Sequence, residues 1–193
     1  MNITVLAKKG GIGKTQTCLL LHEALRQAGK TVRVHDWNSE QGTFTKAFRS
    51  IYGKMPPVSG EFEYNIWDTP PSLEMIATEA AVLNAEVALV IASPEPADTW
   101  ETDAAVSFVL EKNPKATLRV IFNKVQKGRL LTRFVEDHIK TLKAVTLPVM
   151  LNTRECYKHA IAQGWSVLDN GAREEAFQLA LAVASLSVNS AHK

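Results

Sequence analysis

The chain lacks several features that would place it outside the ordinary globular proteins. None of its apolar runs reaches the roughly 18 residues that a membrane-spanning helix needs. Its beginning is interrupted by Lys8, Lys9 and a glycine-rich turn, which is not the pattern of a signal peptide. Internal repeats and low-complexity segments are absent as well. We therefore expect a cytoplasmic protein, and the 193 residues suit a single domain, 1–193, with one sizeable core.

Cysteine and histidine are scarce and scattered. Cys18 and Cys156 provide neither a disulfide framework nor a metal-binding spacing, and the five histidines form no ligand pattern. The net charge of +2 is too small to demand or exclude a nucleic-acid partner. Its distribution says more, because residues 112–158 hold many lysines and arginines but few acidic residues.

Apolar runs of strand length alternate with stretches of helical periodicity along most of the chain. This alternation predicts an α/β fold, a mostly parallel twisted sheet with helices on both faces. The expected strands are Ile3–Ala7, Thr31–His35, Tyr64–Asp68, Glu86–Ala92, Thr117–Phe122 and Thr146–Met150. The expected helices are one that contains Cys18 and ends at Gly29, then Thr99–Leu110, Leu130–Leu142 and Ala172–Leu186, whereas Phe48–Phe62 reads as a loop.

The first expected strand leads directly into a glycine-rich turn that reads Lys-Gly-Gly-Ile-Gly-Lys-Thr at residues 9–15, and a helix follows. A phosphate-binding P-loop requires this context, because its glycines let successive N–H groups face phosphate oxygens at a helix N-terminus. Lys14 would reach the β- and γ-phosphates, and the Thr15 hydroxyl would ligate Mg²⁺. The expected nucleotide-binding residues of this loop are Lys9, Gly10, Gly11, Ile12, Gly13, Lys14, Thr15 and Gln16.

One position separates this loop from the standard P-loop, which has glycine where this chain has Lys8. Residues 9–15 resemble instead the deviant Walker A motif of the ParA/MinD ATPases, Lys-Gly-Gly-x-Gly-Lys-Thr, at every fixed position. The resemblance implies that ATP and Mg²⁺ bind here and that a homodimer forms around two ATP molecules. In that family the first lysine of the motif crosses the dimer interface to the partner's nucleotide, which gives Lys9, together with Lys14, a catalytic role.

A second specific segment extends the resemblance. Residues 64–72 look like the Walker B and switch II region of the family, an apolar strand that ends in Asp-Thr-Pro-Pro. A carboxylate at the end of a strand beside a P-loop is placed to hold Mg²⁺, usually through water. Asp68 is that carboxylate in this chain.

Weaker matches carry the resemblance to about residue 170. Asn123 resembles the residue that contacts the adenine base in the family. The pair that it forms with Lys124 could also indicate guanine recognition, but the aspartate expected two residues after Lys124 is Gln126. Residues 154–167 resemble the last loop and helix of the family pattern, where Arg154 would lie near the base and contact the nucleotide or the dimer interface.

The end of the second expected strand departs from the family pattern. The family reads Asp-x-Asp-Pro-Gln, and its second aspartate is the usual candidate for positioning the attacking water. Asp36 matches the first aspartate, and we expect it to serve catalysis and the metal, but the second position holds Asn38, or Ser39 if the segment is shifted by one. Asparagine can orient water but cannot accept its proton at neutral pH. Glu40 could substitute if the loop bends inward.

The resemblance implies a role in segregating a plasmid or positioning another DNA cargo. The short ParA-like proteins bind non-specific DNA in the ATP state, which would place this chain on the nucleoid, and they respond to a small DNA-binding adaptor of the ParB type. The basic second half of the chain fits the DNA step, because phosphate contacts do not depend on base sequence. The expected DNA-binding residues are Arg129, Arg133, Lys140, Lys143 and Lys158.

Other functions of the same superfamily fit less well. Membrane positioning in the manner of MinD uses a basic amphipathic helix at the C-terminus, and residues 182–193 lack its charge and its bulky apolar face, so we expect no membrane partner. A P-loop synthetase or kinase would need a substrate constellation that we do not find. An iron–sulfur carrier would need a cysteine pair at a dimer interface. Conjugative DNA transfer and other cargo positioning remain open.

The residue at position 38 predicts slow or partner-dependent ATP hydrolysis. Phosphoryl transfer depends mainly on charge stabilisation and positioning, so the loss of a carboxylate slows the reaction without abolishing it. Phosphate release by the purified chain should be slow and should disappear in Lys14→Ala. Rapid turnover by the chain alone, abolished by Lys14→Ala but unchanged by Asn38→Ala, would contradict this argument.

Overall fold

The computed structural model describes residues 1–37, 42–57, 59–126 and 130–190, and it describes their side chains except at 130–133 and 187–190. Within these ranges, six strands form one sheet in the order β2-β3-β1-β4-β5-β6, and all five neighbouring pairs are parallel. The strands are β1 (Asn2–Leu6), β2 (Val32–Asp36), β3 (Tyr64–Asp68), β4 (Val87–Ala92), β5 (Thr117–Phe122) and β6 (Val145–Thr146). The predicted parallel α/β fold is confirmed.

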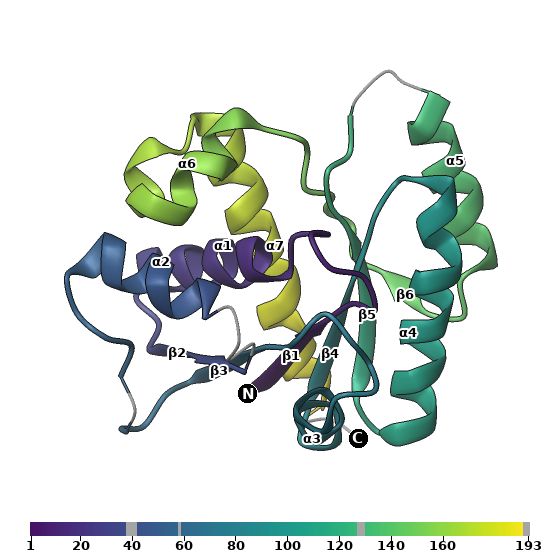
Figure 1. Cartoon of the computed structure of the whole chain (residues 1–193), viewed down its shortest axis with the longest axis horizontal. Helices are drawn as coiled ribbons and strands as arrows, with labels where there is room; N and C mark the ends of the chain where they lie inside the picture. The colour runs from purple at the N-terminus through teal and green to yellow at the C-terminus, as the bar shows by residue number, and fades with distance from the viewer. Residues whose placement is uncertain (38–41, 58, 127–129, 191–193) are drawn as a thin grey trace.

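Helices cover both faces of the sheet, as Figure 1 shows. One face carries α1 (Lys14–Gln27), α2 (Thr43–Tyr52), α6 (Glu155–Gln163) and α7 (Asn170–Ser190), and the other carries α3 (Ile76–Leu83), α4 (Thr99–Lys112) and α5 (Leu130–Thr141). Two short 3-10 helices, η1 (Pro96–Asp98) and η2 (Gly164–Val167), precede α4 and α7. Each layer of helices encloses its own hydrophobic core, and all six residues of β4 are buried because this strand is covered on both faces.

The predicted sixth strand is much shorter than expected. Only Val145–Thr146 pairs as β6, whereas the prediction was Thr146–Met150. The alternation that suggested a strand is real, because Leu147, Val149 and Leu151 are all buried. Beyond Thr146 the segment is attached to β5 by separate bonds from the Leu147 and Leu151 N–H groups to the carbonyl groups of Val120 and Phe122. The donors are four residues apart and the acceptors two, so the chain around Pro148 leaves the regular ladder.

The prediction that Phe48–Phe62 is a loop is wrong over its first five residues. They belong to α2, which ends where Gly53 adopts a left-handed conformation with φ of 65°. The helix could have been recognised from Phe44, Phe48 and Ile51, which fall on one helical face. Phe44 and Phe48 pack edge-on against His22 of α1, so α2 is fixed to the helix that follows the P-loop.

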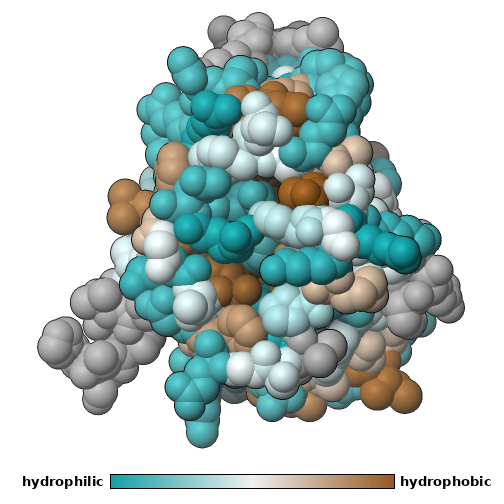
Figure 2. Space-filling view, turned by 90° about the vertical axis from the view of Figure 1, so that its left-hand side faces the viewer, coloured by the Kyte–Doolittle hydropathy of each residue, from teal (hydrophilic) through white to brown (hydrophobic). Residues whose placement is uncertain are grey.

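The surface over α2 and α6 is predominantly hydrophilic, with hydrophobic residues in separate patches, in the side view of Figure 2. None of the described helices is long and apolar enough to cross a membrane. Both observations are consistent with helices whose apolar faces are directed toward the sheet.

The core on the α1 side predicts a large difference between two leucine truncations. Leu21 of α1 is fully buried, so Leu21→Ala should lower the free energy of unfolding by about 2 to 5 kcal/mol. Leu181 of α7 is 72% exposed, and Leu181→Ala should change it by less than about 0.5 kcal/mol. Urea unfolding followed by circular dichroism measures both, and equal losses would contradict this assignment of the core.

Candidate functional site

The turn between β1 and α1 has the backbone of an anion cradle. Gly11 and Gly13 have φ of 71° and 102°, a left-handed conformation that other residues rarely adopt. The first turn of α1 contains no acidic residue, and no side chain caps its N-terminus. The N–H groups and partial positive charge of this helix end therefore face the open site, which suits phosphate.

The end of β5 supports the cradle from behind. The Nδ2 group of Asn123 donates to the carbonyl of Ile12 at 3.0 Å, and the Lys124 ammonium donates to the carbonyl of Gly11 at 2.6 Å. A Cβ atom at position 13 would lie 1.9 Å from Asn123 Nδ2, so Gly13 is needed for this contact. Asn123 is fully buried and lines the cavity described below, while its predicted contact with the base stays a prediction.

Lys14 carries a charge that the surrounding protein compensates poorly. It is 7% exposed, and burial lowers its pKa despite the attraction of Asp68. Among the described residues, no carboxylate lies within ion-pair distance of its ammonium, which reaches only the carbonyl of Lys9 at 3.5 Å. A buried ammonium in this condition is stabilised by an incoming anion such as a phosphate.

Oxygen ligands gather beside this ammonium. The parallel register of β2 and β3 places Asp36 next to Asp68, and Asp68 Oδ2 accepts a hydrogen bond of 2.7 Å from the Thr15 hydroxyl. The second oxygen of each carboxylate is buried and has no hydrogen-bond partner in the described part of the chain. Burial, reinforced by the charge of Asp36, raises the pKa of Asp68 to about 6.

These three residues fit a Mg²⁺ ion, which prefers oxygen ligands and would satisfy both orphaned carboxylate oxygens. An ion held by these residues would neutralise the negative charge of bound phosphates. The structure thus brings together Thr15, Asp36 and Asp68, the three metal ligands predicted from the sequence.

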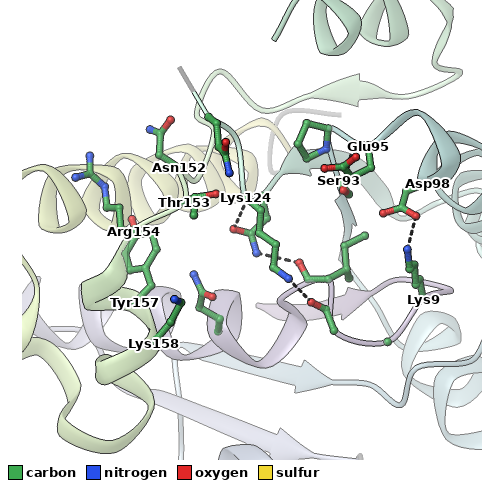
Figure 3. A pocket seen from close by; sticks show the side chains of 17 residues that line it. Lys9, Ser93, Glu95, Asp98, Lys124, Asn152, Thr153, Arg154, Tyr157 and Lys158 are labelled. Carbon is green, nitrogen blue, oxygen red and sulfur yellow. Dashed lines mark hydrogen bonds and ion pairs between the residues drawn. The ribbon is translucent and has the colours of Figure 1, made fainter. Parts of the chain in front are cut away.

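Two adjoining hollows extend from the cradle. The smaller, of about 210 Å³, is lined by Gly10, Gly11, Gly13, Lys14, Thr15, Gln16, Thr43 and Pro71. The larger, of about 460 Å³, shares Gly10, Gly11 and Gln16 with it and continues between the β4–η1 segment and the start of α6, as Figure 3 shows. A cavity of this size that leads away from a phosphate cradle suits a nucleoside.

The family model of the CobQ/CobB/MinD/ParA nucleotide binding domain matches residues 3–167. The chain belongs to this family. The match covers the P-loop, Asp36, Asp68 and the lining of the larger cavity, so the ParA/MinD resemblance inferred from residues 9–15 is confirmed.

Individual proteins are similar to this chain in sequence or in fold. The chain is 24% identical over 194 residues to "Maintenance of carboxysome distribution protein A" of Halothiobacillus neapolitanus, with 89% of this chain and 88% of the relative covered. It is similar in fold to the MinC:MinD cell division protein complex of Aquifex aeolicus, with 18% identity, 95% of each chain covered and a TM-score of 0.78. It is also similar to an ATP complex of a Cyanothece McdA variant, with 18% identity, coverage of 94% and 95%, and a TM-score of 0.73.

Lys9, the first lysine of the P-loop motif, forms an ion pair within its own chain. Lys9 Nζ lies 2.6 Å from Asp98 Oδ1, on η1 at the end of the loop that follows β4. The hydrogen bond and charge of Asp98 raise the pKa of Lys9. Lys9 thus lines the larger cavity, with its side chain 54% exposed, and its predicted crossing to a partner's nucleotide stays a prediction.

Arg154 also lines the cavity, but its guanidinium is directed at two carboxylates. Its Nη2 and Nε groups donate to Glu175 of α7 at 2.6 and 3.0 Å, and Nη1 donates to Asp169 at 3.3 Å. The sequence interpretation missed Glu175. A signal was available, because Glu175 falls on the same helical face as the buried Ala172 and Leu179.

The structure does not describe several of the residues that were predicted for catalysis or DNA binding. Asn38, Ser39 and Glu40 of the predicted switch I segment lie outside the described residues, as do Arg129 and the side chain of Arg133.

The described DNA candidates do not form one patch. Lys140 and Lys143 are exposed at the end of α5, whereas Lys158 is exposed on α6, across the sheet. Lys140 and Lys158 each pair with an acidic residue three positions earlier, at 2.8 Å. Such exposed pairs are weak, so phosphate groups could replace them.

The raised pKa of Asp68 predicts that this site costs stability while it holds no ligand. Because the pKa is about 6 in the folded chain, ionisation of Asp68 opposes folding above that pH. Asp68→Asn should raise the free energy of unfolding of the nucleotide-free chain by about 1 to 3 kcal/mol at pH 7, and the gain should vanish near about pH 4. The same variant should lose the stabilisation that Mg²⁺ adds to ATP. Urea unfolding across this pH range measures both effects, and a less stable variant at pH 7 would contradict the argument.

Proposed function

We propose that this chain is an ATP-driven switch that positions a cargo on DNA. In this proposal ATP and Mg²⁺ bind the P-loop, two chains dimerise around two nucleotides, and the dimer binds non-specific DNA until hydrolysis releases it. The observation that carries the proposal is the buried Lys14 ammonium beside the orphaned oxygens of Asp36 and Asp68. A metal-bound polyphosphate would neutralise both the ammonium and the carboxylates.

Different residues bind the phosphates and the metal ion during hydrolysis. The N–H groups at the start of α1 and the Lys14 ammonium hold the phosphates and stabilise the charge that develops on them. Thr15, Asp36 and Asp68 hold the metal, and the rate is set by how the attacking water is positioned. With Asn38 at the position where the family has a carboxylate, we propose that turnover is slow and rises when a partner protein binds.

Family membership and the name of one relative support the positioning role. The relative from Halothiobacillus neapolitanus is named for maintaining carboxysome distribution. We propose that this chain acts likewise on a cargo that is carried over DNA, either a plasmid or a protein compartment, and that a small adaptor protein links the two. A ParB-like DNA-binding protein would be the adaptor if the cargo is a plasmid.

The DNA interface that we propose is centred on α5. Lys140, in the last turn of α5, and Lys143, just beyond it, are both exposed. Phosphate contacts of this kind release counterions, so the affinity falls steeply with salt and is indifferent to base sequence. Lys158 on α6 is a separate candidate, because it also lines the larger cavity.

Nucleotide-dependent binding to DNA tests the proposal. The chain with ATP should retard a non-specific DNA duplex, and the chain with ADP should not. Lys9→Ala should abolish binding, because the ATP dimer would not form. The double variant Lys140→Glu and Lys143→Glu should weaken binding and reduce the salt slope by about one for each lost phosphate contact.

Two comparisons sharpen this test. Lys158→Glu, measured in parallel, shows whether α6 contributes to DNA binding or whether α5 acts alone. Equal binding with ATP, with ADP and without nucleotide would contradict the switch, whatever the effect of the lysine variants.

A further inference from the structure

One buried carboxylate organises a wall of the larger cavity. Glu175 on α7 is 8% exposed. Its Oε1 accepts hydrogen bonds from Asn152 Nδ2 at 2.6 Å and from Arg154 Nη2 and Nε at 2.6 and 3.0 Å. Its Oε2 accepts from the Asn152 N–H at 3.0 Å and from the Tyr157 hydroxyl at 2.7 Å. A single side chain thus receives five donors from three residues.

The three donor residues are all cavity residues. Asn152, Arg154 and Tyr157 line the larger hollow together with Thr153, and Figure 3 shows them along one wall, across from Lys9 and Asp98. The P-loop holds the phosphates at the other end, so the base and ribose must occupy the space beside this wall. The wall therefore faces the part of the nucleotide that distinguishes ATP from a bare polyphosphate.

Little else fixes the shape of the wall. Residues 151–154 belong to no helix or extended strand, and Asn152 pairs with Val125 only in an isolated bridge. Backbone hydrogen bonds of Leu151 and Thr153 to Phe122 and Val125 attach the segment to the end of β5. These bonds do not fix the orientation of the side chains. Hydrogen bonds to Glu175 orient the side chain of Asn152, and those to Glu175 and Asp169 orient the side chain of Arg154.

We propose that Glu175 is a positioning residue for the base and ribose end of the nucleotide. It acts through Asn152, Arg154 and Tyr157 and does not touch the nucleotide itself. This inference rests on the proposed ATP site and deepens it, because it names the residue that makes the site selective for a nucleoside over phosphate alone.

The chemistry of the carboxylate explains why an amide cannot replace it. Burial alone would raise the pKa of Glu175, but the hydrogen bonds from Arg154, Tyr157 and Asn152 outweigh burial and lower it, so the group is ionised at neutral pH. Both of its oxygens are acceptors. Glutamine offers one acceptor and turns an NH₂ group toward donors, so it leaves some of the five donors unpaired.

Glu175→Gln and two further variants test the proposal. Glu174→Gln is the matched control, because Glu174 is the neighbouring residue on α7, exposed and bonded only to Gln178 in the described contacts. Gly171→Ala perturbs the same wall from another position, because its Cβ would lie 2.7 Å from Arg154 Nη2. Alanine also favours a helix more than glycine does, so this variant should fold.

The measurement compares two ligands by calorimetry in the presence of Mg²⁺, namely ATP and inorganic tripolyphosphate. Glu175→Gln should weaken ATP binding about tenfold and leave tripolyphosphate binding within about twofold. Gly171→Ala should change the same ratio in the same direction, and Glu174→Gln should change neither affinity. Thermal unfolding of each variant shows that the chain remains folded.

Two outcomes would overturn the inference. Equal weakening of ATP and tripolyphosphate would mean that Glu175 supports the fold as a whole, and unchanged ATP binding in both Glu175→Gln and Gly171→Ala would mean that the wall does not position the nucleotide. Failure of the wild-type chain to bind ATP is a distinct result, since it would overturn the proposed function and this inference with it.

Discussion

The structure depends on an electrostatic arrangement that is incomplete without a ligand. Within the described part of the chain, Lys14 is a buried cation without a carboxylate in contact, and Asp36 and Asp68 each have one buried oxygen without a hydrogen-bond partner. Each half alone would be costly to bury. A metal-bound polyphosphate supplies an anion to the first and a cation to the second, so one ligand resolves both. The parallel register of β1, β2 and β3 brings these groups to the same edge of the sheet.

The helices that contact the nucleotide site at this edge of the sheet are the ones that a bound nucleotide can displace. α2 begins at Thr43, which lines the phosphate hollow, and its aromatic side chains pack against His22 of α1. At the opposite end, the wall held by Glu175 connects the cavity to α7. Both connections run through helices on one face of the sheet, whereas the lysines of α5 that we propose for DNA lie on the other face. A link between nucleotide and DNA would therefore have to pass through the sheet edge or through a second chain.

Sequence patterns predicted the parts of this structure that depend on local physics. The strands Tyr64–Asp68 and Thr117–Phe122 were predicted to the residue, because they are short apolar runs with clear boundaries. The P-loop followed from glycine spacing, and the strand ends indicated that Asp36 and Asp68 meet beside it. β6 was overestimated because Leu147, Val149 and Leu151 alternate in burial as in a strand, although the ladder to β5 ends at Thr146. The partner of Lys9 could not be predicted, since Asp98 is distant in sequence and meets it only after folding. Glu175 lies on the apolar face of α7, which marks it as a buried carboxylate, but its pairing with Arg154 also depends on the fold.

Gly13 has a consequence for how this chain can vary. Its missing side chain leaves the space that the amide of Asn123 occupies, just after β5 in the other half of the chain. The left-handed φ of 102° keeps position 13 a glycine, and any side chain there would also collide with the amide. A residue at 123 without the amide would remove the brace behind the loop. Transplanting the P-loop into another scaffold would therefore require the amide that follows β5 as well as the seven residues of the motif.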